Sequence, residues 1–477
     1  MHLALCLLLV LLGVGVHQVR RQYIRSWFVR GAARPLDASA ALAQPPAGGA
    51  QRPVRVVLVD GLGERTAREL PALQRLCSAG LRLRVDVGFP SVSLAVQHAL
   101  WTGAWQQSSG VLFPYDNKLD RPVYPSLPGL VAQRSANAVA IAESHGELVA
   151  SFPFTRVVAP ARDGAPFTPL ALQQEALAAA QSNAALVFVH LLSVDEAGHA
   201  HGARSLPYRA AARRADELVA GLHQVQQEAR WMLVVLSDHG HLPQGGHGDL
   251  EDDVRFAPAC VVGPGIAPSV GAATIPDLTR LIAGELRVAP PAAEGRSLVE
   301  LLAGAAPPAA PQRCLLGASA PGLLLAALLL ATFVWLARRG ERPPRVLLLG
   351  LPWAQGLGLL LVVVAGGAPS LSHAYVYPHW PATLLAAGAL PAALGLGLQV
   401  WLLLRSPRLV PARAIGLLAV GAVIPAVIVT ALSGWPLRVP PLSPFITGWA
   451  STLQLLAASG LVATGLWGLW ALAYKKD

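Results

Sequence analysis

The sequence predicts an α/β domain with a layered, mostly parallel sheet, followed by an α-helical transmembrane region. Two patterns predict this class. Between residues 53 and 305, short aliphatic runs alternate with helix-like stretches, and beyond residue 313 long apolar segments follow one another. In addition, only 13% of the 477 residues are charged and 53% are hydrophobic. Because soluble chains are about a quarter charged, part of this chain is expected to lie in lipid.

Changes in composition divide the chain into four expected regions. Residues 1–22 hold a short apolar run followed by arginines, which is typical of a membrane anchor or signal-like segment, and its cleavage stays open. Residues 23–52, rich in Ala, Pro and Gly, are expected to be a linker. Residues 53–305 are expected to form the catalytic domain, and residues 313–477 the membrane domain.

The expected membrane domain holds about five apolar segments, each long enough to cross roughly 30 Å of hydrocarbon. They are residues 321–337, 346–365, 380–404, 414–435 and 446–474.

Charge predicts the orientation of these segments. The loops 338–345 and 405–413 and the tail 475–476 are basic. The alternate loops, 366–379 and 436–444, contain one basic residue, Arg438. Basic loops favour the cytoplasmic side, which places the catalytic domain on the non-cytoplasmic side, whether periplasmic, extracellular or lumenal. The arginines near residue 20 point the other way, but they are one signal against three.

The net charge of +10 does not indicate nucleic-acid binding, because the positive residues are scattered or lie beside apolar segments. The cysteines form no CxxC pair, so neither a cysteine metal site nor a dense disulfide framework is expected. A single Cys77–Cys260 disulfide stays open, and the sequence does not determine the oligomeric state.

Within the catalytic domain, the aliphatic runs are expected to be strands that alternate with helices. Continuous apolar strands of this kind are typical of a largely parallel sheet covered on both faces, where ligands gather beyond the carboxyl ends of strands. The expected strands are residues 54–59, 81–87, 138–142, 186–192, 232–237 and 259–262, and the helix-like stretches include 170–181 and 208–228.

Aspartates and histidines follow three of these strands, as expected for a metal site at one rim of the sheet. Carboxylate oxygens and imidazole nitrogens suit two Zn²⁺ ions. An aspartate after a strand is often only a turn or cap residue, but six of the 13 histidines fall from residue 199 to residue 247, which favours a shared metal site. The candidate ligands are Asp60, Asp195, His199, Asp238, His239 and His247.

A candidate nucleophile follows the second strand. Ser93 lies where a helix is expected to begin, and a serine beside a metal can ionise and attack phosphorus. The alternatives are that Ser93 only caps the helix, or that Ser91 is the nucleophile.

These motifs resemble the alkaline phosphatase superfamily, and within it the phosphodiesterase and GPI ethanolamine phosphate transferase branches. The resemblance covers about residues 54–266. The chain departs from the transferases in having fewer C-terminal spans, and from many members in having Ser93 where they have threonine. The motifs, in the order of the superfamily, are Asp60-Gly61-Leu62, Pro90-x-x-Ser93 with Thr102-Gly103, Asp195-x-x-Gly198-His199, Asp238-His239-Gly240 and Gly246-His247-Gly248.

The resemblance implies two zinc ions, although other divalent metals stay open, and a phosphoserine intermediate on Ser93. It further implies that Asn117 contacts phosphate, while the alternative is an ordinary turn residue. His201 and His241 are candidates for supporting or substrate contacts. The implied ligands are Asp60, Ser93, Asp238 and His239 for the first ion, and Asp195, His199 and His247 for the second.

The implied function is transfer of a phosphoethanolamine-type head group from a phospholipid donor to a lipid- or glycan-linked acceptor. The alternative is a membrane-anchored phosphodiesterase or nucleotide pyrophosphatase, because one catalytic set serves either water or an alcohol. A sulfatase is excluded by the absence of a C/S-x-P-x-R sequence around Ser91 and Ser93. A catalytically dead domain is disfavoured because no ligand of the set is missing.

Overall fold

The computed structural model describes residues 52–112, 121–161, 164–229, 231–290, 292, 294–297, 300–301 and 372. The expected anchor, linker and apolar C-terminal segments lie outside these residues, apart from 52 and 372. Among the described residues, no helix has the length and apolar character needed to cross a membrane.

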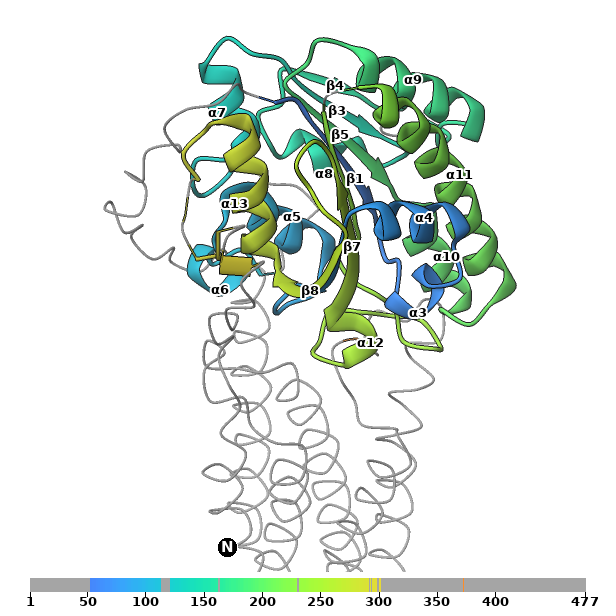
Figure 1. The fold of residues 1–477 in the computed structure, drawn as a ribbon. Helices are drawn as coiled ribbons and strands as arrows, with labels where there is room; N and C mark the ends of the chain where they lie inside the picture. The colour runs from blue at the N-terminus through green and yellow to red at the C-terminus, as the bar shows by residue number, and fades with distance from the viewer. Residues whose placement is uncertain are drawn as a thin grey trace, which may run out of the picture. The chain divides into compact units, whose positions relative to one another are not determined.

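One eight-stranded sheet organises the described residues (Figure 1), and its strand order is β4-β3-β5-β1-β6-β7-β2-β8. Only β7 runs antiparallel to its neighbours, so the predicted α/β class with a mostly parallel sheet is confirmed. The strands are β1 Val54–Val59, β2 Leu81–Asp86, β3 Ala138–Ala142, β4 Arg156–Val158, β5 Leu186–Leu191, β6 Met232–Leu236, β7 Phe256–Val262 and β8 Ser269–Thr274.

The sequence analysis missed two of these strands. Both β4 and β8 lie at the ends of the sheet, and their residues are largely exposed. Without an apolar run or a clear alternation, an edge strand leaves little hydrophobic signal in the sequence.

Helices cover both faces of the sheet, because the central strands are apolar on both sides. Alternate residues of β1 enter the two cores: Val56 and Leu58 lie in one, and Val57 and Val59 lie in the other. The first core is closed by α5 Ser93–Thr102, α7 Leu127–Gln133, α8 Gly146–Ala150 and α13 Ile275–Leu286. The second core is closed by α3 Glu64–Ala67, α4 Pro71–Ala79, α9 Pro169–Gln181, α10 Ser193–His201 and α11 Leu206–Glu228.

The long helix α11 also anchors the chain after β1. Asp216 on α11 accepts hydrogen bonds from the backbone N–H groups of Ala72 and Leu73, at the start of α4. Tyr208 donates its hydroxyl proton to the carbonyl of Gly61 at 2.7 Å. These bonds fix the turn that carries Asp60.

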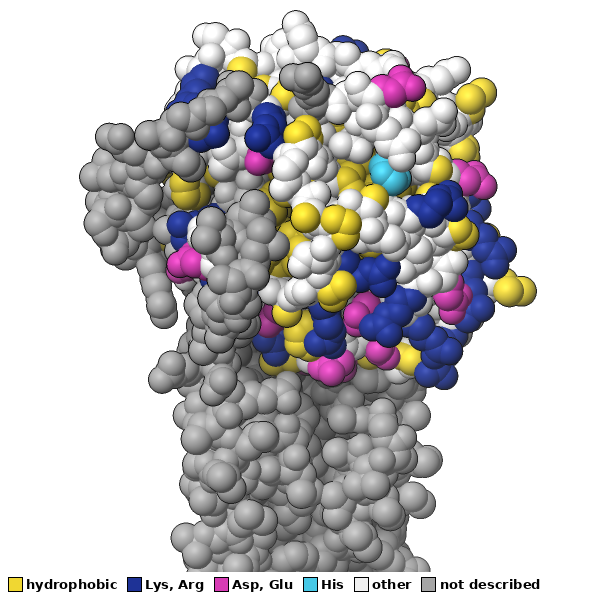
Figure 2. All heavy atoms as spheres, in the orientation of Figure 1, with side chains coloured by type: hydrophobic (Ala, Val, Ile, Leu, Met, Phe, Trp, Pro, Cys, Tyr) yellow, Lys and Arg dark blue, Asp and Glu magenta, His cyan; other side chains and the backbone are white. Residues whose placement is uncertain are grey.

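Positive and negative side chains are interspersed on the face shown in Figure 2. For example, Glu64 lies 2.7 Å from Arg68 and 3.2 Å from Arg84. Exposed pairs of this kind contribute little to stability, typically about 0–1 kcal/mol.

Cys77 on α4 and Cys260 on β7 form a disulfide, with a Cα–Cα distance of 4.9 Å. The sequence left this pairing open because 183 residues separate the two cysteines. Both side chains are buried, and the bond ties α4 to the sheet.

We expect replacement of both Cys77 and Cys260 by serine to lower the free energy of unfolding by about 2–5 kcal/mol, because the cross-link restricts the unfolded chain. Pulse proteolysis of the full chain in urea would measure the change. Reductant should destabilise the wild type to a similar degree and leave the double variant unaffected. Equal stability of the oxidised wild type and the variant would contradict this prediction.

Candidate metal centre and nucleophile

The predicted ligands meet at the carboxyl ends of three adjacent strands. Asp60 follows β1, Asp195 lies in the first turn of α10 after β5, and Asp238 follows β6. Because β5, β1 and β6 are neighbours in the sheet, their carboxyl ends share one rim. Asp60 and Asp238 have no exposed surface, and Asp195 is 8% exposed.

The first cluster consists of Asp60, Asp238, His239 and Ser93. The Ser93 hydroxyl donates to Asp60 Oδ1 at 3.2 Å, and the Ser93 oxygen lies 3.3 Å from His239 Nε2. His239 Nε2 also lies 3.3 Å from Asp60 Oδ1 and 3.5 Å from Asp238 Oδ2. Asp238 Oδ1 accepts the N–H of Gly61 at 3.1 Å, while its Oδ2 is buried and has no hydrogen-bond partner among the described residues.

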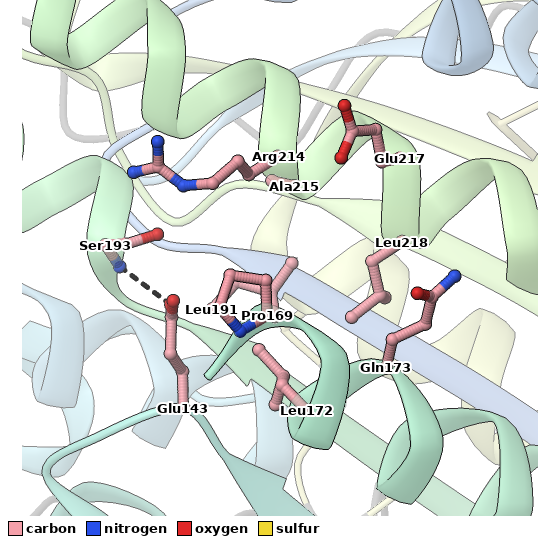
Figure 3. Close-up of a pocket in the computed structure, with 10 residues that line it drawn as sticks. All are labelled: Glu143, Pro169, Leu172, Gln173, Leu191, Ser193, Arg214, Ala215, Glu217 and Leu218. Atoms are coloured by element: carbon pink, nitrogen blue, oxygen red, sulfur yellow. Dashed lines mark hydrogen bonds between the residues drawn. The ribbon is translucent and has the colours of Figure 1, made fainter. Parts of the chain in front are cut away.

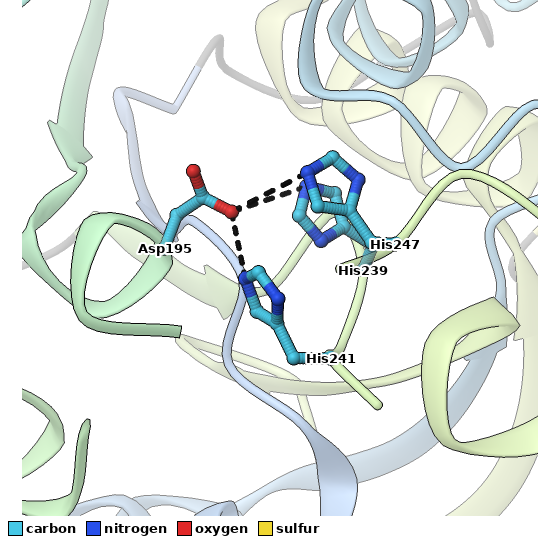
Figure 4. Close-up of side chains that lie close together, drawn as sticks. All are labelled: Asp195, His239, His241 and His247. Carbon is cyan, nitrogen blue, oxygen red and sulfur yellow. Dashed lines mark hydrogen bonds and ion pairs between the residues drawn. The ribbon is translucent and has the colours of Figure 1, made fainter. Parts of the chain in front are cut away.

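The second cluster consists of Asp195, His199 and His247. His199 Nε2 lies 3.4 Å from Asp195 Oδ2 and 3.1 Å from His247 Nε2. His247 Nε2 lies 3.6 Å from Asp195 Oδ1. Figure 4 shows His247 beside His239, with the two rings stacked at 3.7 Å between centroids. The two clusters therefore adjoin.

The spacing of these atoms fits metal ions. In a tetrahedral zinc site with bonds of about 2.0 Å, neighbouring ligand atoms lie about 3.3 Å apart. The three distances among Asp60 Oδ1, Ser93 Oγ and His239 Nε2 are 3.2, 3.3 and 3.3 Å. The unpartnered Oδ2 of Asp238 would gain a partner from the same ion. The residues present therefore fit a divalent cation in the first cluster.

Backbone carbonyls orient two of the imidazoles. His239 donates its Nδ1 proton to the carbonyl of Gly240 at 3.1 Å, and His247 donates its Nδ1 proton to the carbonyl of Ser91 at 2.8 Å. In each ring Nδ1 is therefore the nitrogen that keeps its proton, and Nε2 is the nitrogen that would bind a metal once the ring is neutral.

The structure gives the two serines different surroundings. Ser91 is fully buried; its hydroxyl donates to the carbonyl of Asp249 and accepts the N–H of Gly248. These bonds, with the Ser91 carbonyl, hold the glycine-rich segment that carries His247. Ser93 lies at the first position of α5 and is partly exposed. Of the two, Ser93 has its oxygen among the candidate metal ligands.

His241 also belongs to the centre, beyond the predicted ligand set. Its Nε2 lies 2.8 Å from Asp195 Oδ1, and with Asp195, His239 and His247 it forms a group whose ligand atoms lie within 4.8 Å of one another (Figure 4). A Cβ at Gly198 would approach the His241 ring to 2.5 Å. A Cβ at Gly61, whose φ is +72°, would approach it to 2.9 Å. Both glycines therefore make room for this ring.

Sequence reasoning missed His190 altogether. It lies within β5, is fully buried, and its Nε2 lies 2.7 Å from Asp60 Oδ2. The available signal was a single polar residue within the apolar run Leu186–Leu191.

Burial and mutual charge set the protonation of the first cluster. Burial raises the pKa of Asp238 to about 7, and the negative charge of Asp60 adds to the effect. Burial opposes ionisation of His239, but Asp238 and Asp60 outweigh it and raise the pKa of His239 to about 10. For Asp60, burial is outweighed by hydrogen bonds with His190 and His239, so its pKa is lowered.

In the second cluster, the pKa values of His247 and Asp195 are both lowered. Burial, together with the charge of His239, lowers the pKa of His247 well below its ordinary value. Burial opposes ionisation of Asp195, but the positive fields of His199 and His241 outweigh it and hold the Asp195 pKa well below its usual range.

The remaining candidates lie elsewhere. Asn117 lies outside the described residues. His201 is exposed at the last position of α10. A small cavity of about 50 Å³ lies between α9 and α11 (Figure 3), but it contains none of the predicted ligands. One residue lining the cavity, Glu143, accepts the N–H of Ser193 at 2.9 Å and so fixes the start of the helix that carries Asp195.

One family model matches part of the chain. Residues 153–258 match the family described as type I phosphodiesterase / nucleotide pyrophosphatase. This segment contains Asp195, His199, Asp238, His239 and His247. The resemblance to the phosphodiesterase branch of the alkaline phosphatase superfamily is confirmed. No curated protein matches the sequence significantly.

Solved structures of low sequence identity are similar to part of the chain. Murine ectonucleotide pyrophosphatase/phosphodiesterase 5, in an inactive form in complex with AMP, is 15% identical; the match covers 52% of this chain and 98% of that one, with a TM-score of 0.42. The lipoteichoic acid synthase LtaP from Listeria monocytogenes is 13% identical, with coverage of 53% and 76% and a TM-score of 0.40.

The two serines can be separated by mutation. We expect Ser93→Ala to lower phosphodiester cleavage at least about a thousandfold, because the attacking oxygen is lost. Ser91→Ala should keep the covalent chemistry and weaken metal binding, because it loosens the segment carrying His247. Cleavage of bis(p-nitrophenyl) phosphate and mass spectrometry of the acid-quenched enzyme would measure both effects. A phosphoryl adduct on Ser91 would contradict this assignment.

Metal binding should depend on pH through the first cluster. Asp238 and His239 must lose their protons to bind a cation, so binding releases protons. Because the metal-free Asp238 titrates near pH 7, we expect the affinity for Zn²⁺ to fall as the pH is lowered from 8 to 6, by about tenfold per unit for each proton released. Calorimetry in two buffers of different ionisation enthalpy would count these protons. An affinity independent of pH over this range would contradict the prediction.

Proposed function

We propose that this protein is a membrane-bound, two-metal phosphotransferase that moves a phosphoethanolamine-type head group from a phospholipid donor to a lipid- or glycan-linked acceptor. The observation that carries the proposal is the position of the Ser93 oxygen, 3.2 Å from Asp60 Oδ1 and 3.3 Å from His239 Nε2. A hydroxyl among candidate metal ligands at the start of a helix is suited to attack phosphorus.

In this proposal Ser93 attacks the donor phosphorus, its Oγ–P bond forms, and the bond to the donor alcohol breaks. Asp60 accepts the hydroxyl proton of Ser93 in a hydrogen bond and so points the oxygen into the centre. Divalent ions bound here would lower the pKa of the serine hydroxyl and neutralise charge on the phosphoryl oxygens. The acceptor alcohol then attacks the phosphoserine, and the Oγ–P bond breaks to regenerate Ser93.

The mixed nitrogen and oxygen donors support zinc as the resident metal. Imidazole and carboxylate ligands suit Zn²⁺. In His239 and His247 a backbone carbonyl accepts the Nδ1 proton, so Nε2 is the nitrogen that would bind the metal.

The expected non-cytoplasmic location of the catalytic domain is supported by the Cys77–Cys260 disulfide. Disulfides persist in oxidising compartments and are rare in the reducing cytosol. The basic loops 338–345 and 405–413 give the same orientation by an unrelated argument.

The preference for an alcohol over water rests on the apolar C-terminal segments. One span would already anchor the chain, since insertion of a transmembrane helix is effectively irreversible. Several spans could position a lipid beside the site and raise its effective concentration.

A second candidate, an anchored phosphodiesterase, is favoured by the family match at residues 153–258. In that case water would attack the phosphoserine, and the same residues would serve.

Partition of the product separates the two functions. The full chain in detergent would receive a phosphatidylethanolamine donor, with and without a glycan-linked acceptor lipid. We expect the acceptor to increase donor turnover and to divert product from free phosphoethanolamine to the conjugate. Chelator should abolish both products, and Zn²⁺ should restore them. Release of free product at the same rate with or without acceptor would support the phosphodiesterase. Undiminished activity in chelator would overturn the two-metal site.

A further inference from the structure

We propose that His190 is a positioning residue for the first metal site: its imidazole donates to Oδ2 of Asp60 and thereby keeps Oδ1 directed at the Ser93 oxygen. This inference rests on the proposed function, since it assigns a role toward the metal that the site would hold. The Nε2–Oδ2 distance is 2.7 Å, whereas Oδ1 lies 3.2 Å from Ser93 Oγ and 3.3 Å from His239 Nε2. The two oxygens of Asp60 thus have separate partners.

The sheet places His190 beneath the metal centre. β5 and β1 are parallel, and Leu58 is the register partner of His190, so Asp60 lies two residues further toward the rim. Side chains alternate along β5: Val189 and Leu191 enter the core beneath α9 and α11, and Phe188 enters the core beneath α5. The side chain of His190 lies on the same face of the sheet as that of Phe188, and the two rings stack with their centroids 6.0 Å apart.

The hydrogen-bond pattern identifies which nitrogen donates. His190 Nε2 lies 2.7 Å from Asp60 Oδ2, and a carboxylate oxygen accepts hydrogen bonds, so His190 Nε2 donates its proton in this contact. His190 Nδ1 is buried with no hydrogen-bond partner in the described residues. An unpartnered N–H would be costlier than an unpartnered lone pair, which favours the neutral Nε2–H tautomer. Among the described residues, the contact of the ring with Asp60 Oδ2 at 2.7 Å is shorter than its contact with the Gln97 amide at 3.4 Å.

His190 is not itself a ligand of the first cluster. The three groups whose ligand atoms converge there are Asp60, Asp238 and His239. His190 contacts Oδ2 of Asp60, whereas Oδ1 faces Ser93 and His239. The amide nitrogen of Gln97, one turn after Ser93 on α5, lies 3.4 Å from His190 Nε2. Without the imidazole, Oδ2 of Asp60 would lose this 2.7 Å donor, and the carboxylate would be free to rotate. Loss of such a supporting contact typically lowers metal affinity about 10–100-fold.

Two amides of different length give a sharp test. In His190→Gln the amide nitrogen can reach the position of Nε2, whereas in His190→Asn it reaches only the position of Nδ1. Both variants remove the ring, so a general loss of packing should affect them alike. His98→Gln and His98→Asn form a matched control pair, because His98 is also fully buried but lies on α5 with its Nε2 accepting the N–H of Val123.

The readout is Zn²⁺ binding to the full chain in detergent, measured by competition with a chromophoric chelator, together with thermal unfolding of the metal-free protein. We expect two ions per wild-type chain. His190→Asn should weaken one ion about 10–100-fold and leave the other unchanged, and His190→Gln should restore most of the loss. The His98 variants should bind both ions as the wild type does.

Other outcomes separate the two proposals. If the wild type binds two ions and both His190 variants retain both affinities, the positioning role is overturned and the two-metal site stands. Equal weakening by Gln and Asn, accompanied by equal loss of thermal stability, would also overturn it in favour of a packing role. A wild type that binds no ion would overturn the proposed function, and the inference with it.

Discussion

The described structure depends on compensating three buried carboxylates. Asp60, Asp195 and Asp238 are buried, and each has a carboxylate oxygen within 3.9 Å of His239 Nε2. An isolated negative charge is strongly unfavourable in such a place. Imidazoles and backbone N–H groups supply part of the compensation, as the 2.7 Å contact of His190 and the N–H of Gly61 show. The raised pKa values of Asp238 and His239 indicate that further positive charge would be accepted at this point. A divalent cation is the natural means to supply it.

Much of the surrounding fold serves to hold those groups in place. Tyr208 fixes the turn after β1, and Glu143 caps the helix that carries Asp195. Ser91 holds the segment that carries His247 by its hydroxyl and by its carbonyl. Because the segments that carry Asp60, Asp195 and His247 have separate anchors, these ligands can keep their positions before any substrate arrives, which is the property that a two-metal site needs.

The same centre could serve either an alcohol or water as acceptor. Ser93 would form the same covalent intermediate in both cases, so neither the ligand set nor the nucleophile distinguishes a transferase from a phosphodiesterase. The distinction depends on whether water or an acceptor alcohol attacks the phosphoserine. The apolar C-terminal segments therefore support lipid transfer, and the buried cluster supports phosphoryl chemistry.

The sequence alone predicted the parallel sheet, because the central strands are continuous apolar runs, and β1 and β3 have the predicted bounds. It also indicated the candidate ligands, because Asp60, Asp195 and Asp238 each follow a strand or begin the helix after it. The edge strands β4 and β8, the Cys77–Cys260 bond, and the contacts of His190 and His241 were decided only by tertiary structure. Each of these depends on segments distant in the chain: Asp60 and His190 are 130 residues apart and meet only because β1 and β5 pair in one register. The hydrophobic pattern of a strand predicts which face of the sheet a side chain occupies. Which residue of another strand it contacts on that face is decided by the order of strands in the sheet.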